Sequence, residues 1–160
     1  MGKELKTNAM RILDKYHISY EIITYECETF IDGISAAEKS GIPVEQTFKT
    51  LIAVGKSGQY YVFVIPAANE LDFKAAAKTV QEKSVELIPV KDITKISGYI
   101  RGGCSPIGMK KQYQTIIQKG ALSFENIAIS AGRIGTSVLL NPNDLKTASG
   151  AIFADIVVHS

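Results

Sequence analysis

The chain contains only two histidines, His17 and His159. A serine, threonine or cysteine nucleophile usually needs an adjacent base to take its proton, and that base is most often histidine. His17 follows directly on a predicted helix and His159 is the penultimate residue, so neither lies beside a candidate nucleophile in the sequence. The histidine count therefore argues against a serine or cysteine triad.

The two cysteines, Cys27 and Cys104, indicate neither a metal site nor a disulfide framework. They show neither the spacing of zinc ligands nor the even-numbered framework of a small secreted domain. No carboxylate cluster stands out that would hold a metal through oxygen alone, and we expect neither a metal nor another cofactor. Cys104 has Arg101 nearby in sequence but no histidine, which favours a packing role. A cysteine hydrolase that uses this thiol stays open as an alternative.

Residues 98–108, GYIRGGCSPIG, contain four glycines and a proline. Adjacent glycines let a ligand approach closely, and they can present consecutive amide N–H groups to an anion. That anion would be a phosphate or the oxyanion of an acyl-transfer reaction. A tight surface turn explains the same composition equally well. The phosphate-loop pattern GxxxxGK[ST] is absent from the chain.

Lys49 stands within an apolar stretch of the sequence. Strand alternation places it on the face opposite Phe48 and Thr50, so its ammonium points either to solvent or into a pocket. Ser130 and Ser137 flank a second glycine turn and could present hydroxyls to a small ligand. An ordinary strand connection is the alternative there.

Basic residues lie on both sides of the glycine loop, at Arg101, Lys110, Lys111, Lys119 and Arg133. If the fold clusters them, they could contact nucleic-acid phosphates. If it does not, they form an ordinary solvated surface.

Hydrophobic periodicity and turn residues predict the elements that position these residues. Helices are predicted over 4–16, 32–39, 72–80, 90–96 and from Pro142 onward, where Asn141 is the cap. Strands are predicted over 18–25, 85–87, 115–117, 127–130, 137–140 and 152–158, and a hairpin joins 48–54 to 59–65. Helices and strands interleave without a strict βαβ rhythm. We therefore predict one α+β domain over 1–160, with a mixed sheet packed by helices.

Length and composition fit an ordinary globular domain. The chain has 160 residues, of which 46% are hydrophobic, enough for one core. Its net charge of +2 is too small to indicate nucleic-acid binding by itself. The N-terminal sequence MGKELKTNAM lacks the apolar region of a signal peptide, and no apolar run is long enough for a membrane span. We therefore expect a cytoplasmic protein that does not bind a membrane.

Several segments together resemble one known family. They are ISY and TY at 18–25, TFKTL at 47–51, SGY followed by GGCSPIGMKK within 97–111, SAG at 130–132 and FADI at 153–156. In this order they span nearly the whole chain and resemble the YbaK/EbsC family of aminoacyl-tRNA deacylases. That family includes an editing domain inserted in some prolyl-tRNA synthetases.

The resemblance implies a single α+β domain built on a mixed, partly barrelled sheet. It implies clearance of mischarged tRNA, with cysteinyl-tRNA(Pro) as the characteristic substrate and cysteinyl-tRNA(Cys) as a second one. It also implies site residues, which fall here on three groups of positions. They are Lys49, Gly102 and Gly103 as catalytic positions; Tyr25, Phe30, Thr50, Ser130 and Ser137 as substrate-binding positions; and Lys110, Lys111 and Arg133 as tRNA-binding positions.

The chain departs from the family pattern at five places around the site. The family often has a branched aliphatic residue in place of Cys104, an apolar residue in place of Arg101 and a glycine in place of Ala131. A Lys–Arg pair usually stands where this chain has Arg-Ile at 133–134, and close relatives often have Asp at Ser137. These changes fall on the pocket rim and on a basic pair.

For this branch of the family, the resemblance implies a reaction without a protein nucleophile. The substrate's own thiol attacks its ester carbonyl, closes a thiolactone and expels the tRNA. The protein then positions the thiol and stabilises the oxyanion, with the amides of Gly102 and Gly103 as candidate donors. Two alternatives stay open: water attack on alanyl-tRNA(Pro), and a non-catalytic regulator that binds a nucleotide or aminoacyl group. The implied partners are tRNA(Pro) and prolyl-tRNA synthetase.

Overall fold

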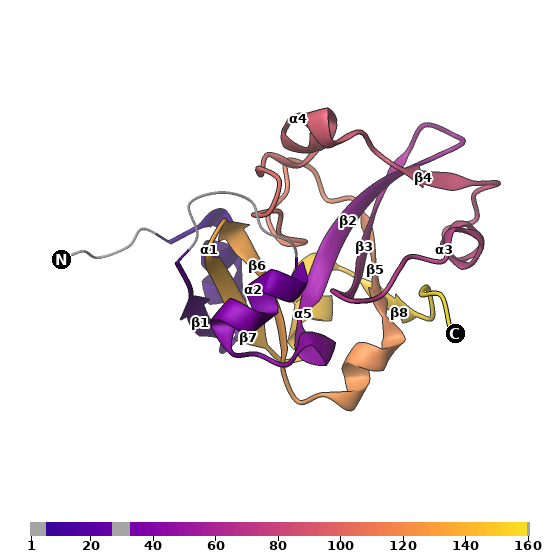
Figure 1. The fold of residues 1–160 in the computed structure, drawn as a ribbon. Coiled ribbons are helices and arrows are strands. Elements are labelled where there is room, and N and C mark those ends of the chain that lie inside the picture. Colours follow the sequence, from indigo (N-terminus) through magenta and orange to yellow (C-terminus); the bar gives the residue numbers. More distant parts are fainter. Residues whose placement is uncertain (1–5, 27–32, 160) are drawn as a thin grey trace.

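The computed structural model describes residues 6–26 and 33–159, which form one α+β domain with two sheets (Figure 1). The predicted fold class is confirmed. No helix in the described part of the chain is both long and apolar enough to cross a membrane. The predicted Asp32 cap, Phe30 and Cys27 lie outside the described residues.

The larger sheet has five strands in the order β4-β2-β3-β5-β8. Their bounds are β2 Phe48–Gly55, β3 Tyr60–Pro66, β4 Val85–Leu87, β5 Gln114–Gln118 and β8 Ile152–Ala154. β2 pairs antiparallel with β3 and β4, whereas β5 pairs parallel with β3 and β8, so the sheet is mixed. The predicted hairpin is β2–β3. The predicted last strand was too long, because regular pairing ends at Ala154 and only an isolated bridge from Val157 to Leu71 follows.

The smaller sheet has the order β1-β7-β6, with β1 Glu21–Thr24, β6 Ile127–Arg133 and β7 Thr136–Leu140. The second glycine turn was predicted too long, because β6 continues through Arg133 with a bulge after Ser130, and only two residues join it to β7. A single parallel bridge, Thr47 to Ala128, joins the edges of the two sheets. The sheets do not close into a barrel, since β2 and β6 form no ladder beyond this bridge.

Five α-helices pack around the sheets in the described part of the chain: α1 Asn8–Lys15, α2 Gly33–Ser40, α3 Phe73–Thr79, α4 Ile93–Ser97 and α5 Pro142–Ser149. Their ends follow the local signals. The Asp72 carboxylate accepts from the amide of Ala75 at the start of α3, and Asn141 caps α5 in the same way. The predicted helix over 90–96 divides, because a 3₁₀ turn at Val90–Asp92 precedes α4.

The main core lies between the smaller sheet and β2–β3, and it includes Leu13 of α1, Val64, Ile129 and Leu145 of α5. A second core covers the other face of the larger sheet beneath α3. Phe48 of β2 enters the main core and Ala53 the second one, while Ile52 belongs to a third, smaller cluster with Ile88 and Ile96. Side chains on both faces of β2 are therefore packed against other elements.

Candidate functional site

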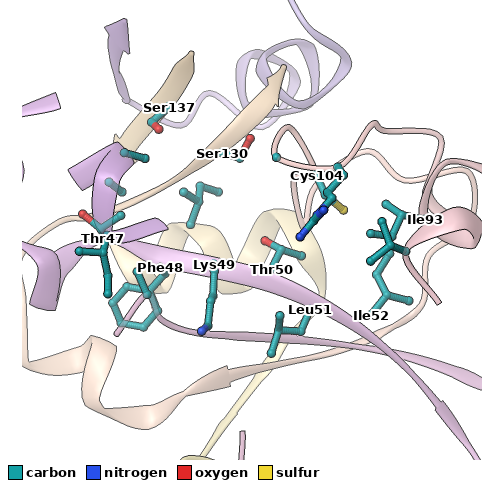
Figure 2. A pocket seen from close by; sticks show the side chains of 18 of the residues that line it. Thr47, Phe48, Lys49, Thr50, Leu51, Ile52, Ile93, Cys104, Ser130 and Ser137 are labelled. Carbon is teal, nitrogen blue, oxygen red and sulfur yellow. The ribbon is translucent and has the colours of Figure 1, made fainter. Parts of the chain in front are cut away.

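A cavity of about 540 Å³ lies where the edges of β2 and β6 separate beyond the Thr47–Ala128 bridge (Figure 2). Its walls come from both sheets, from α2, from residues 87–93 and from the glycine loop. This volume is in the range typical of small-molecule sites. The junction of the two sheets therefore forms the candidate site.

Most of the residues predicted from the sequence meet at this cavity. Six of them line it: Tyr25, Lys49, Thr50, Gly102, Ser130 and Ser137. Four others are not among the lining residues: Gly103, Lys110, Lys111 and Arg133.

Lys49 shares one face of β2 with Leu51. Figure 2 shows its side chain leaving the strand on the side away from Ser130 and Ser137. Burial lowers the pKa of the Lys49 ammonium, while the negative charge of Glu70 acts in the opposite direction. In the described part of the chain the ammonium has no hydrogen-bond or ion-pair partner. It is a half-buried cation at the edge of the cavity.

Thr50 lies on the opposite face of β2. Its hydroxyl oxygen Oγ1 is buried and, among the described residues, has no hydrogen-bond partner. A buried polar group without a partner costs free energy, so its retention calls for a functional explanation. Because Thr50 lines the cavity, a bound ligand could supply the missing partner.

The glycine loop begins with a tight turn over Ile100–Gly103. The amide of Gly103 donates to the carbonyl of Ile100 at 2.9 Å, and Gly102 adopts φ +85° at the third position, as a type II turn requires. A Cβ atom on Gly103 would lie 2.9 Å from the Cα atom of Arg133. Gly103 is therefore a packing residue whose amide is already used. The amide of Gly102 has no acceptor in the described part of the chain, and it alone of the two predicted donors remains available.

Tyr99 holds this loop against β6, a role that the sequence did not predict. Its buried hydroxyl donates to the carbonyl of Ile107 at 2.6 Å, and burial raises its pKa to about 12. Gly108 and Gly132 leave room for the ring: a Cβ atom would lie 2.8 Å from the Tyr99 hydroxyl oxygen at Gly108 and 2.9 Å from Cε1 at Gly132. Asn8 of α1 donates to the carbonyl of Gly108 at 2.8 Å. These contacts fix the loop that carries Gly102.

Ser130 and Ser137 are opposite each other in the β6–β7 pair. Both are half-buried and both line the cavity. Opposed residues in an antiparallel pair have Cβ atoms about 5 Å apart, so the two hydroxyls lie near each other on one wall. This wall can donate and accept hydrogen bonds but carries no charge.

Cys104 also lines the cavity, but its thiol is poorly suited to nucleophilic attack. Burial raises its pKa to about 11, against a smaller opposing effect of the Ser97 hydroxyl. A cysteine reacts as the thiolate, which is nearly absent at neutral pH with such a pKa. Cys104 packs instead against Ile52, Ile88 and Ile96.

The predicted tRNA-binding residues do not form one cluster on the cavity wall. The Nζ atom of Lys110 donates to the carbonyl of Lys95 at 3.1 Å, near the end of α4. The Nε atom of Arg133 donates to the Thr136 hydroxyl at 3.2 Å. Lys111 is exposed. Lys110 therefore uses part of its hydrogen-bonding capacity on α4.

Apolar residues supply much of the remaining lining, and the sequence did not single them out. Ile34 of α2, Leu87, Val90 and Ile93 line the cavity. Ile34, Leu87 and Val90 are exposed, although apolar side chains of this size usually pack inside. The one sequence signal was the apolar run on both sides of Pro89. This rim could shield a ligand from water.

The sequence pattern of the aminoacyl-tRNA editing domain family matches residues 32–148. That range is most of the chain and contains the strands, the glycine loop and the opposed serines that form the cavity. The chain belongs to this family.

A curated relative matches this chain over nearly its whole length. EbsC of Enterococcus faecalis (strain ATCC 700802 / V583), named as a candidate Cys-tRNA(Pro)/Cys-tRNA(Cys) deacylase, is 40% identical over 152 residues. The match covers 94% of this chain and 93% of EbsC.

Solved structures share the editing-domain fold at lower identity. A candidate trans-editing enzyme for prolyl-tRNA synthetase has a TM-score of 0.82 and 22% identity, over 98% of this chain and 100% of that one. A hypothetical protein has a TM-score of 0.87 and 21% identity, over 95% of this chain and 100% of that one. At these identities the likeness supports the fold alone.

Neither histidine of this editing domain lines the cavity. His17 adopts φ +59° just after α1, and the Nε2 atom of His159 lies 2.8 Å from the Asp155 carboxylate. Within the described residues, no group of three or more His, Cys, Asp or Glu side chains has the arrangement of a metal site. Among the described residues, the polar groups at the cavity are therefore hydroxyls, backbone amides, the Cys104 thiol, the Lys49 ammonium and the Arg101 guanidinium.

Proposed function

We propose that the chain acts in trans as a deacylase that removes cysteine from Cys-tRNA(Pro), with Cys-tRNA(Cys) as a second substrate. Membership of the editing-domain family and the name of the 40% identical relative support this proposal. The observation that carries it is a cavity whose described residues offer donors and hydroxyls but no activated nucleophile. A substrate that supplies its own nucleophile suits such a site.

In the proposed reaction, the substrate's thiol sulfur attacks the ester carbonyl carbon. A C–S bond forms, the bond from that carbon to the 3′-oxygen of the terminal ribose breaks, and the thiol proton passes to this oxygen. The products are the free tRNA and the thiolactone of cysteine. The protein holds sulfur and carbonyl in attack geometry, for which effective molarities of about 10⁵ M or more are known. It also stabilises the oxyanion through the amide of Gly102, a donor of the type worth roughly 3 kcal/mol.

The other walls of the cavity bind the aminoacyl part of the substrate and exclude water. Ser130, Ser137 and the Thr50 hydroxyl supply neutral hydrogen-bonding groups to the aminoacyl part of the substrate. Tyr25 supplies an aromatic wall at the cavity, and we propose the same role for Phe30, which lies outside the described residues. The apolar rim excludes water and so favours the internal thiol over hydrolysis.

The charged residues serve the nucleic acid in this proposal. The Lys49 ammonium lies across β2 from the Thr50 hydroxyl, which favours a contact with the terminal phosphate or ribose over one with the reacting carbonyl. Lys110, Lys111 and Arg133 would contact phosphates of the acceptor stem. With a net charge of only +2, the chain would gain selectivity for tRNA(Pro) by acting beside prolyl-tRNA synthetase.

Deacylation of Cys-tRNA(Pro), with Ala-tRNA(Pro) measured in parallel, tests the proposed function. Loss of cysteine at a rate at least about 100-fold above that of alanine is expected if the thiol is the nucleophile. Comparable loss of both amino acids would replace this mechanism with water attack. Loss of neither, with folded chain and the synthetase present, would favour a regulator that binds without turnover.

A further inference from the structure

One side of β2 is unpaired along part of its length. β3 follows β2 on the other side from end to end, whereas β4 pairs only with Ala53–Gly55. The last contact from the β4 side is the amide of Ile88, which donates to the carbonyl of Ile52 at 3.1 Å. Pro89 and a 3₁₀ turn then lead the chain away. The Thr47–Ala128 bridge closes the other end, so an open edge lies between them.

Odd- and even-numbered residues of β2 direct their backbone N–H and C=O groups to opposite sides of the strand. The carbonyl of Thr47 accepts from the amide of Ala67 on the β3 side, at 2.8 Å. The carbonyl of Ile52 accepts from the β4 side. Because the N–H and C=O of one residue in an antiparallel ladder point the same way and alternate along the strand, those of Thr50 point with Ile52. They face the open edge, where the β4 ladder does not reach Thr50 and no other backbone acceptor for its amide lies among the described residues.

This open edge is part of the cavity wall. Thr50 lines the cavity together with Gly102, whose amide is also unpaired in the described part of the chain. The buried Thr50 hydroxyl without a described partner is a separate indication that a polar ligand belongs here. Gly103, the second donor suggested by the sequence, is unavailable because its amide is bonded to Ile100. A second oxyanion donor must therefore come from another element.

An aminoacyl ester has the polar groups of one peptide residue in a strand. Its carbonyl oxygen accepts, its α-ammonium donates, and one carbon separates them. A residue in an antiparallel pair exchanges both bonds with one residue opposite. Extended ligands commonly bind unpaired sheet edges in this way. The Thr50 N–H and C=O thus match the part that every aminoacyl ester has in common.

We propose that the backbone of Thr50 binds the aminoacyl group as a single-residue β-bridge. The Thr50 N–H donates to the ester carbonyl oxygen and remains bonded as that oxygen becomes the oxyanion, with Gly102 as the other donor. The Thr50 C=O accepts from the α-ammonium. This inference rests on the proposed function, because it takes an aminoacyl ester as the ligand. The side chains of the other cavity walls then determine which amino acid is accepted.

Replacement of one backbone amide by an ester tests the bridge. In the full chain, the α-hydroxy acid corresponding to Thr50 deletes its N–H and keeps its side chain. It also weakens the Lys49 carbonyl as an acceptor in the β2–β3 ladder. The matched control is the same replacement at Ile22 of β1. The amide of Tyr25 donates to the carbonyl of Gly135 in the β6–β7 turn, so the odd-numbered residues of β1 direct their backbone groups toward β7. The N–H of Ile22 therefore points away from β7 at the free edge of the sheet, while the carbonyl of Glu21 faces β7.

We expect the Thr50 ester to lower kcat/KM for Cys-tRNA(Pro) by roughly 100-fold or more, as loss of an oxyanion donor does. The Ile22 ester should stay within about twofold of the unmodified chain. A Thr50 ester within about threefold of the control would overturn the proposal.

Amide exchange in the unmodified, ¹⁵N-labelled chain gives a second measurement if the ester variant does not fold. The probe is 3′-deoxy-3′-(cysteinylamino)adenosine, whose amide link resists cleavage. The Thr50 N–H should exchange with solvent faster than that of Leu51 in the free chain and at least about tenfold more slowly at saturation. No slowing with bound probe would overturn the bridge. Failure of the unmodified chain to deacylate any aminoacyl-tRNA would instead count against the proposed function alone.

Discussion

Replacing Thr50 with Val separates stability from activity at one buried group. The substitution exchanges the hydroxyl for a methyl group and keeps the branched shape that suits a strand. The hydroxyl is buried and has no hydrogen-bond partner among the described residues, so folding desolvates it without compensation. An unsatisfied buried polar group costs about 1–3 kcal/mol. Thr50→Val should therefore raise the free energy of unfolding by about that amount, and Tm by roughly 2–4 °C for each kcal/mol.

The same substitution should weaken catalysis. If the hydroxyl finds its partner in the substrate, its removal deletes one neutral hydrogen bond, worth about 0.5–1.5 kcal/mol. The expected loss in kcat/KM for Cys-tRNA(Pro) is then roughly two- to tenfold. Thr50→Ser restores a hydroxyl and should recover most of the activity, although it loses the buried methyl group.

Thermal unfolding and single-turnover deacylation, measured on the same preparations, check both effects. The matched control is Thr115 of β5, a buried threonine whose hydroxyl donates to the carbonyl of Tyr113 at 3.0 Å. Thr115→Val should lower stability by about 1 kcal/mol, with activity unchanged. If Thr50→Val instead lowers Tm as the control does and leaves turnover intact, the Thr50 hydroxyl has a partner in the free protein and none in the substrate.

Four further outcomes are expected. Lys49→Met should raise KM for Cys-tRNA(Pro) about tenfold with little change in kcat; a fall in kcat alone in steady-state kinetics would place the ammonium at the reacting carbonyl. Gly103→Ala should lower stability by about 1–3 kcal/mol in denaturant unfolding, because its Cβ atom would crowd the backbone of β6; unchanged stability would contradict the packing role. Cys104, with a pKa of about 11, should resist alkylation by iodoacetamide at pH 7 in a Cys27→Ser background. Rapid alkylation, measured by mass spectrometry, would support Cys104 as a nucleophile. The Ser57 hydroxyl holds the pKa of Glu82 below its usual value. This carboxylate should therefore stabilise the fold above its unfolded pKa, and the stabilisation should be lost as pH falls through the lower folded pKa. Glu82→Gln should flatten that part of the curve of Tm against pH, and an unaltered curve would exclude the contribution.

The features that the sequence predicted well depend on neighbouring residues. Asn141 and Pro142 mark the start of α5 because an N-cap side chain and a fixed φ act within one turn. The hairpin of β2 and β3 follows from two β-rich runs around a glycine turn. Lys49 and Thr50 could be assigned to opposite faces because side chains alternate along any strand. Six of the site residues that the family motifs predicted line one cavity.

The features that the sequence did not predict depend on distant contacts. Gly103 resembles an amide donor in the sequence, but its contact with β6 and its bond to Ile100 give it a packing role. Lys110 resembles a phosphate ligand, but it reaches the end of α4. The bulge in β6 and the open edge of β2 arise from how strands pair across the molecule. No local pattern encodes which side of a strand will lack a neighbour.

The Thr47–Ala128 bridge, the one backbone link between the edges of the two sheets in the described residues, also has a consequence for folding. The lining residues of the cavity run from Tyr25 to Ser137 of β7, so the nascent chain has no complete site until β7 has left the ribosome. Contacts between such distant segments form late, since loop closure opposes them. A local separation of the two sheets at this bridge would dismantle the cavity while each sheet stayed paired internally. Thermal inactivation should therefore precede the loss of secondary structure.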